Sequence, residues 1–315
     1  MQLTAASRIY VAGHRGLVGS AIVRALQQRG HAQLVLRTHS ELDLTSQADV
    51  RRFFETERPE GVIMAAARVG GIHANNSRPA SFIRDNLLIQ DNVIDAAHRS
   101  GVGKFVFLGS SCIYPKLCPQ PIKEEYLLSG PLEPTNEWYA IAKIAGVKMC
   151  QAYRREFGFN AISVMPTNLY GPGDNFDLQS SHVLPALIRR FHEAKVRGDA
   201  SVTVWGTGTP RREFLHVDDL ADAVLYLLHS YDGESLVNIG WGADLTIREL
   251  AEMVVSVIGY SGRLLFDPAM PDGTPRKLLD VSRLTSLGWR ARIPLKDGIE
   301  RTYAWFKEHA ADARL

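Results

Sequence analysis

Short, continuous apolar runs alternate with longer amphipathic segments through the first half of the chain. Such runs are typical of strands buried on both faces of a sheet, and amphipathic segments between them are typical of covering helices. The apolar runs predict strands at residues 9–12, 33–36, 61–64, 104–108 and 160–165. The amphipathic segments predict helices at residues 17–28, 48–57, 82–99 and 139–157. This order predicts an α/β fold with a Rossmann-type, doubly wound parallel sheet.

The alternation changes after Tyr170, where a turn rich in glycine and proline interrupts it. Thr246 and Glu249 have the spacing of a capping box, which predicts that a helix begins just after Thr246. The other elements expected in this half are a helix at 183–197, a strand at 201–205, a helix that opens near Val217 and a last helix from about residue 295. Residues 214–229 look like a return to the first domain.

The pattern therefore predicts two domains between which the chain passes more than once. Residues 1–170 and about 213–240 are expected to form a Rossmann-type nucleotide-binding domain. Residues from about 171 to 212 and from 241 to 315 are expected to form a smaller C-terminal α/β domain that binds the substrate.

Composition narrows the class of protein. With 315 residues, 45% of them hydrophobic and 22% charged, the chain suits a large globular enzyme or binding protein. A net charge of +2 gives no reason to expect nucleic acid or an anionic membrane as a partner. The sequence shows neither a signal peptide nor an apolar run long enough to span a membrane, so we expect a cytoplasmic protein. The three cysteines have no spacing typical of a disulfide framework or a metal site.

A glycine-rich turn follows the first predicted strand and leads into the first predicted helix. It consists of Gly13, His14, Arg15, Gly16, Leu17, Val18 and Gly19. Glycines at these positions permit a tight turn, close approach of the backbone to a pyrophosphate, and packing of the helix on the sheet. Because a strand and a helix flank the turn, the sequence favours a dinucleotide site over an ordinary strand–helix connection.

The residues after the second predicted strand bear on which dinucleotide binds. Enzymes that use NAD usually carry an acidic residue there for the ribose hydroxyls. This chain has Arg37 instead, and Arg15 lies in the glycine-rich turn. Guanidinium groups suit a 2′-phosphate, so NADP(H) is favoured, unless Arg37 only covers the surface end of its strand. Asp43, Leu44 and Ala66 are expected to line the adenine and the ribose–pyrophosphate region.

Tyr139 and Lys143 are four residues apart on a predicted helix, so they share one helix face. A nearby ammonium favours the ionised phenol and is expected to lower the pKa of Tyr139. Such a tyrosine gives a proton to a carbonyl oxygen that is being reduced. Ser110 follows a buried strand at the carboxyl edge of the sheet, where its hydroxyl is placed to bind the same oxygen. Alone, Ser110 would be interpreted as a serine that bonds the backbone; together, the three residues predict carbonyl reduction.

Cys112 lies two residues after Ser110 and is expected to face the same cleft. A thiolate there would remove a proton from a carbon next to a ketone, and His182 is the candidate acid partner. Both residues have an ordinary alternative, because most lone cysteines are small buried hydrophobes and most histidines at a helix start are caps or surface groups. Cys118 and Cys150 are interpreted as structural.

Arg190, Trp205 and Arg212 lie in the second domain's share of the chain. Two guanidinium groups and an indole suit a nucleotide diphosphate with a stacked base or sugar. Solvated surface arginines are nearly as good an interpretation of the same residues.

Together these features resemble the extended short-chain dehydrogenase/reductase family, whose members act on nucleotide sugars. The resemblance covers nearly the whole chain and rests on the glycine-rich turn, residues 109–115, residues 139–143 and residues 166–172. Longer and more specific strings narrow it to the epimerase/reductases of GDP-4-keto-6-deoxy-mannose. These strings lie at residues 69–72, 75–76, 133–137 and 271–277.

The resemblance implies two reactions in one pocket. Cys112 as base and His182 as acid would invert C3 and C5 of the 4-keto sugar. NADPH would then reduce C4 while Tyr139 protonates the oxygen, assisted by Lys143 and Ser110. This order follows because the C4 ketone acidifies its neighbours only until it is reduced.

The resemblance also implies a binding set for each ligand. Carried over by position, Arg190, Trp205, Arg212, Asp272 and Lys277 would surround the GDP-sugar. The cofactor would contact Leu108, Gly109, Ser110, Ser111, Lys143, Pro166, Thr167, Asn168, Leu169 and His182. His39 departs from the pattern, because the family often has a second arginine there for the 2′-phosphate, so selectivity for NADPH would rest on Arg15 and Arg37. Members are commonly homodimers that pair through helices corresponding to residues 82–99 and 139–157.

Two other functions are compatible with a dinucleotide-binding fold: sugar 4-epimerisation and regulation by NADP binding. A sugar 4-epimerase of the same family keeps its NAD and needs no base that acts on carbon, so Cys112 and His182 disfavour it. A regulator that binds NADP without chemistry has no use for a proton donor, so Ser110, Tyr139 and Lys143 disfavour it.

Overall fold

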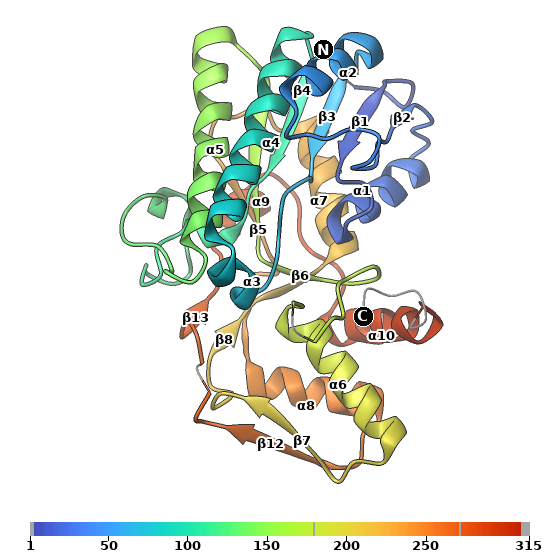
Figure 1. Cartoon of the computed structure of the whole chain (residues 1–315), viewed down its shortest axis with the longest axis vertical. Helices are drawn as coiled ribbons and strands as arrows, with labels where there is room; N and C mark the ends of the chain where they lie inside the picture. The colour runs from blue at the N-terminus through green and yellow to red at the C-terminus, as the bar shows by residue number, and fades with distance from the viewer. Residues whose placement is uncertain (1–2, 179, 271, 310–315) are drawn as a thin grey trace.

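A six-stranded parallel sheet forms the centre of the larger part of the molecule in the computed structural model, which describes residues 3–178, 180–270 and 272–309. The strands are β1 (Ile9–Ala12), β2 (Leu34–Val35), β3 (Gly61–Met64), β4 (Lys104–Leu108), β5 (Ala161–Pro166) and β10 (Val237–Ile239). They lie in the order β10-β5-β4-β3-β1-β2 (Figure 1). Almost every residue in them is buried, as expected for strands covered on both faces. The predicted doubly wound α/β fold is confirmed.

Helices cover both faces of this sheet. Their bounds are α1 (Leu17–Gln28), α2 (Gln47–Glu57), α4 (Pro79–Arg99), α5 (Glu137–Phe157) and α7 (Val217–Ser230). Helices α1 and α7 pack against each other on one face, and α2, α4 and α5 cover the other (Figure 1). Each turns an apolar side inward, for example Phe53 and Phe54 from α2 and Ile144 and Val147 from α5.

Strand β1 pairs with β2 on one side and with β3 on the other. The chain therefore moves outward in one direction from β1 to β2, and in the opposite direction from β3 onward. In open α/β sheets, ligands bind at such a switch point, outside the carboxyl ends of the strands. The glycine-rich turn after β1, Ala66 after β3, and Ser110 and Cys112 after β4 all follow strands that end at this edge.

A second hydrophobic core forms the smaller part of the molecule, below the main sheet in Figure 1. It lies among α6 (Val183–Arg197), β7 (Ser201–Trp205), α8 (Ile247–Ile258), β12 (Arg263–Asp267) and α10 (Leu295–His309). The capping box that opens α8 is confirmed, since Thr246 Oγ1 accepts from the Glu249 amide and the Glu249 carboxylate accepts from the Thr246 amide.

Short strands connect the two parts. Strand β6 (Asn168–Tyr170) pairs with β9 (Phe214–His216), and β8 (Arg211–Arg212) lies between β11 (Leu245–Thr246) and β13 (Arg276–Lys277). Residues 214–239 thus supply α7 and β10 to the larger part, which supports the domain division proposed for that segment.

Several local features differ from the sequence-based expectation. Strand β10 and the short helices α3 (Ile72–Ser77) and α9 (Ser282–Ser286) were not expected, and β2 is shorter than predicted. Leu279, Leu284 and Trp289 belong to the cores of the main sheet, although residues 241–315 were assigned to the substrate domain. Pro271, part of one family string, lies outside the described residues. In the part of the chain that the structure describes, no helix is long and apolar enough to cross a membrane.

Candidate active site

The glycine-rich turn has the geometry of a dinucleotide cradle. Gly13 has a φ of +80°, and a Cβ there would lie 2.8 Å from the Ala66 backbone. A Cβ on Gly19 would lie 2.1 Å from the Gly13 carbonyl oxygen, so only glycine lets α1 pack this closely on the turn. Gly16 precedes α1 in an extended conformation with no side-chain cap, which leaves first-turn amides available to an anion. The residues present therefore fit the pyrophosphate of a nicotinamide dinucleotide.

The basic residues near this turn differ in how free their side chains are to bind a 2′-phosphate. The Arg37 guanidinium pairs with Glu57, donates to the Leu36 carbonyl and lies 5.9 Å from the centre of the Phe53 ring. Arg37 is therefore anchored against α2, and this geometry favours its interpretation as a residue that covers the strand end. Arg15 and His39 are both exposed, and of the two only Arg15 carries a permanent charge.

The other residues expected at the cofactor lie near the carboxyl ends of the strands, and some of their side chains pack against the core. Asp43 accepts from the Thr45 amide and hydroxyl, and its neighbour Leu44 packs against the core and accepts from Asn92 through its carbonyl. The end of β5 and start of β6 is held by Asn168, whose Nδ2 donates to the Glu213 carbonyl oxygen at 2.8 Å. Thr167 donates from its amide to the Ile239 carbonyl. The residues expected at the cofactor lie at the carboxyl ends of β4 and β5 or directly after them; they are Leu108, Gly109, Ser110, Ser111, Pro166, Thr167, Asn168 and Leu169.

Tyr139 and Lys143 lie on α5 as predicted, but the lysine does not lower the pKa of the tyrosine. Burial raises the pKa of Tyr139, the Cys112 thiol raises it further, and a hydrogen bond with Ser110 only partly opposes them. Lys143 donates to the Leu108 carbonyl at 2.8 Å, and its ammonium lies 5.9 Å from the centre of the Tyr139 ring. Burial lowers the pKa of Lys143 to about 8. The prediction of a lowered Tyr139 pKa is therefore wrong for this structure, because burial and the Cys112 thiol raise the pKa more than Ser110 lowers it.

Ser110 connects the two reactive groups. It precedes the one-turn helix η1 (Ser111–Ile113), and its Oγ accepts from the Cys112 amide at 3.2 Å. The same side chain lowers the pKa of both Tyr139 and the Cys112 thiol. A single hydroxyl thus places a proton donor and a thiol around one point, where a carbonyl oxygen would be bound.

Two donors from distant parts of the chain reach the Cys112 sulfur. Asn136 Nδ2, at the start of α5, lies 3.3 Å from Sγ, and Lys277 Nζ on β13 lies 3.5 Å from it. Burial by itself raises the pKa of Cys112, but the Lys277 charge and the hydrogen bonds from Ser110, Lys277 and Asn136 outweigh it and lower the pKa. These contacts favour the interpretation of Cys112 as a base over that of an inert buried thiol.

His182 lies directly before α6, with no side-chain cap bond to the helix. Its side chain is open to solvent, yet the protein around it and the Lys277 charge lower its pKa, so the imidazole is neutral at pH 7. Lys277 therefore lies near enough to both His182 and Cys112 for its charge to lower the pKa of each.

A small pocket opens beside Cys112. Its walls come from the loop after β4, the start of α5 and β13. They are formed by Ser111, Cys112, Tyr114, Pro115, Lys116, Gln120, Ile122, Glu133, Asn136, Thr274, Arg276 and Lys277. The thiol therefore faces open space that is bounded by both parts of the molecule.

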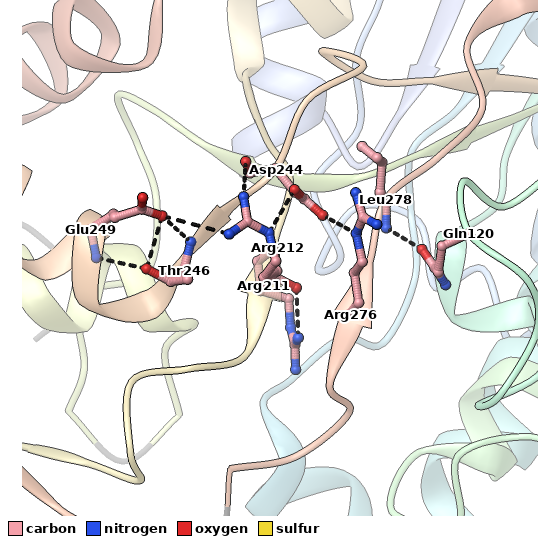
Figure 2. Close-up of polar contacts among 8 residues, drawn as sticks. All are labelled: Gln120, Arg211, Arg212, Asp244, Thr246, Glu249, Arg276 and Leu278. Carbon is pink, nitrogen blue, oxygen red and sulfur yellow. Dashed lines mark hydrogen bonds and ion pairs between the residues drawn. The ribbon is translucent and has the colours of Figure 1, made fainter.

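The residues expected around the GDP-sugar form two groups. The Arg190 guanidinium lies 5.5 Å from the centre of the Trp205 ring, and that indole is 60% exposed, as a stacking surface for a ligand would be. Arg212 is partly buried, and its side chain donates to the Arg211 carbonyl (Figure 2). Its charge also interacts with Asp272 and Glu133. Asp272 also accepts from the Thr207 amide and hydroxyl. Lys277, which is also expected at the GDP-sugar, lies with its Nζ 3.5 Å from Cys112 Sγ.

Two residues at the site were not assigned a role from the sequence. Asn136 lies in one of the strings that carry the family resemblance, but only the fold shows that it reaches the thiol. Glu213 is fully buried and accepts from the amides of Gly242 and Leu279. No local pattern marks Glu213, because its partners lie far away along the chain.

Comparison with known proteins agrees with this geometry. The model of the NAD dependent epimerase/dehydratase family matches residues 9–240. The chain is 64% identical to GDP-L-fucose synthase 1 of Arabidopsis thaliana, over 97% of this chain and 95% of that protein. It is 57% identical to GDP-L-fucose synthase of Escherichia coli, over 96% and 97% respectively. A GDP-mannoheptose C4 reductase from Campylobacter jejuni, solved with NADP bound, superposes with a TM-score of 0.90 at 42% identity, over 97% of this chain and 99% of that one.

The family match covers most of the chain, and both relatives are matched along nearly their whole length. The same carboxyl-edge loops that build the site described above lie inside the matched residues. The chain therefore belongs to the NAD dependent epimerase/dehydratase family.

Proposed function

We propose that the chain converts GDP-4-keto-6-deoxy-D-mannose into GDP-L-fucose, by epimerisation at C3 and C5 followed by reduction of C4 with NADPH. The observation that carries this proposal is the placement of Cys112 beside Ser110 and Tyr139, where the Ser110 side chain lowers the pKa of both the phenol and the thiol, and Asn136 and Lys277 reach the sulfur. The names of the relatives reported above support the same substrate and product.

Epimerisation begins at the carbons next to the ketone. The Cys112 thiolate removes the proton from C3 or C5, and the Ser110 and Tyr139 hydroxyls bond the developing enolate oxygen at C4. His182 takes up a proton from solvent and gives it to the opposite face of the carbon, which inverts that carbon and returns the imidazole to its neutral form. The thiol then returns its proton to solvent, so each inversion exchanges one carbon-bound hydrogen.

Reduction closes the sequence. The reduced nicotinamide, when bound, supplies hydride to C4. Tyr139 gives its phenolic proton to the C4 oxygen, and the Lys143 ammonium beside the ring stabilises the phenolate that remains. Once C4 carries a hydroxyl, C3 and C5 are no longer acidic, so epimerisation precedes reduction.

The basic residues support NADPH as the cofactor. Arg15 is exposed in the glycine-rich turn, where it is free to bind a 2′-phosphate, and His39 lies on the loop after β2. Gly13, Gly16 and Gly19 would hold the pyrophosphate at the start of α1.

We also propose that two copies of the chain pair through α4 and α5. These helices pack side by side on one face of the sheet, and α5 exposes the apolar side chains of Trp138, Ile141 and Phe157. A dimer would cover part of that apolar surface.

The experiment offers the purified protein NADPH with fresh GDP-4-keto-6-deoxy-D-mannose, and separately with 4-keto sugars attached to other nucleotides. We expect rapid loss of NADPH absorbance with the GDP-sugar only, and GDP-L-fucose as the product identified by NMR. No loss of NADPH with the fresh GDP-sugar would refute the proposal. Turnover of UDP-glucose with bound NAD would instead favour the 4-epimerase.

A further inference from the structure

Lys277 reaches the active site from the other part of the molecule, on a segment that we name the strap, residues 276–280. Its first two residues form β13, which pairs in parallel with β8. Arg276 and Arg211, neighbours across this pair, both bond the carboxylate of Asp244 (Figure 2). The start of the strap is thus fixed to the smaller part.

The rest of the strap is fixed to the larger part. The Leu278 amide donates to the Gln120 side chain at 2.8 Å, as Figure 2 shows. Ile122 donates to the Leu278 carbonyl at 2.7 Å and accepts from the Asp280 amide at 2.8 Å. The Leu279 amide donates to the buried carboxylate of Glu213 at 3.0 Å. Hydrogen bonds on both sides of Lys277 therefore set its position, rather than the side chain's own contacts.

The charge of Lys277 is directed at sulfur. Its Nζ lies 3.5 Å from Cys112 Sγ, and in the described part of the chain no carboxylate lies within ion-pair distance of that ammonium. The acid nearest to the thiol in the cavity wall is Glu133, which pairs with Lys116 at 3.0 Å and accepts from Thr274. A thiolate at Cys112 would be the natural counterion for Lys277.

The other groups that face the thiol do not replace this cation. Tyr139 and Asn136 on α5 and Ser110 on the loop after β4 are neutral hydrogen-bonding groups. Arg276 is held by Asp244, and His182 on α6 is neutral at pH 7. Lys277 is thus the permanent positive charge in contact with the sulfur among the described residues.

We propose that Lys277 is a positioning residue that holds Cys112 as a thiolate. The strap, which is fixed to the smaller part of the molecule, thereby supplies the positive charge that the base needs. The role of the thiolate in removing protons from C3 and C5 rests on the proposed function. The ionisation of the Cys112 thiol in the free protein does not depend on that function. The ionisation and the proton removal can therefore be tested separately.

The test measures how fast iodoacetamide alkylates Cys112 as a function of pH, read by mass spectrometry at the peptide that carries this residue. Only the thiolate reacts, so the rate rises with pH through the pKa of the thiol. In Lys277→Met and Lys277→Gln the midpoint should rise by about 1 to 3 pH units, the usual effect of losing an opposite charge at this distance. Lys277→Arg keeps the charge and should restore most of the low midpoint.

The control is Lys148→Met, which removes an exposed lysine on α5 whose ammonium donates to Gln151 and should leave the midpoint unchanged. Circular dichroism establishes that each variant is folded. An unchanged midpoint in folded Lys277→Gln or Lys277→Met would overturn the proposal, as would a midpoint in Lys277→Arg as high as in Lys277→Met.

Deuterium exchange at C3 and C5 of the substrate, measured across the same pH range, should shift in parallel with alkylation. If alkylation shifts while the unmodified protein shows no exchange, the proposed function fails and the role of Lys277 in setting the thiolate stands.

Discussion

At the scale of single residues, burial and hydrogen bonding decide what each reactive group is able to do. Ser110 lowers the pKa of both Tyr139 and Cys112, yet the two pKa values move in opposite directions from their usual values. Burial dominates for the phenol, which keeps its proton and is suited to donate it. For the thiol, the charge of Lys277 and the hydrogen bonds from Ser110, Asn136 and Lys277 outweigh burial, which favours the thiolate and suits it to act as a base. One pocket thereby holds an acid and a base.

Tyr139→Phe removes the phenolic proton but keeps the ring. Reduction of the 4-keto sugar should slow by about 100- to 10,000-fold, the range expected for loss of a general acid. Deuterium exchange at C3 and C5 should continue, because Cys112 and His182 are unchanged. The measurement follows NADPH loss and exchange in one sample; loss of both together would show that the two steps do not divide between these residues as proposed.

At the scale of elements, the sequence predicted correctly those turns and helix starts whose geometry depends only on neighbouring residues. The strand, glycine-rich turn and helix at residues 9–28 could be recognised because each glycine meets a steric demand of that turn. The capping box at Thr246 is equally local and was predicted correctly. The ion pair between Arg37 and Glu57 could not be predicted in this way, because Glu57 lies at the far end of α2 and only the fold brings the two side chains together.

Arg15 and Arg37 give a matched pair of substitutions for cofactor selectivity. Arg15→Ala should raise KM for NADPH by about 10- to 100-fold, as loss of a charge-assisted bond to phosphate costs about 1.5–3 kcal/mol. The KM for NADH should stay nearly constant, since NADH has no 2′-phosphate. Arg37→Ala should change selectivity much less, because its guanidinium is already paired with Glu57. Steady-state kinetics with both cofactors check this; a larger loss of selectivity in Arg37→Ala than in Arg15→Ala would contradict it.

At the scale of the whole molecule, the site is completed by segments that are distant in sequence. The strap brings Lys277 to Cys112, and Asn136 reaches the same sulfur from the start of α5. The family resemblance marked Lys277 as a binding residue, but its contact with the thiol depends on pairing of β13 with β8 and on Gln120 and Ile122. Long-range pairings of this kind leave no periodic signal, which is also why β10 was not predicted.

The central claim is that epimerisation and reduction take place in one pocket, in that order. The measurement that tests it most directly is the hydrogen isotope content of the product formed from GDP-4-keto-6-deoxy-D-mannose and NADPH in heavy water. Deuterium enters a carbon only where a base has removed its proton, so NMR of the product sugar reports each position separately.

We expect GDP-L-fucose with deuterium at both C3 and C5, formed far more slowly by Cys112→Ser than by the unmodified protein. A product reduced at C4 that carries ordinary hydrogen at C3 and C5 would contradict it, because NADPH would then have been used without epimerisation.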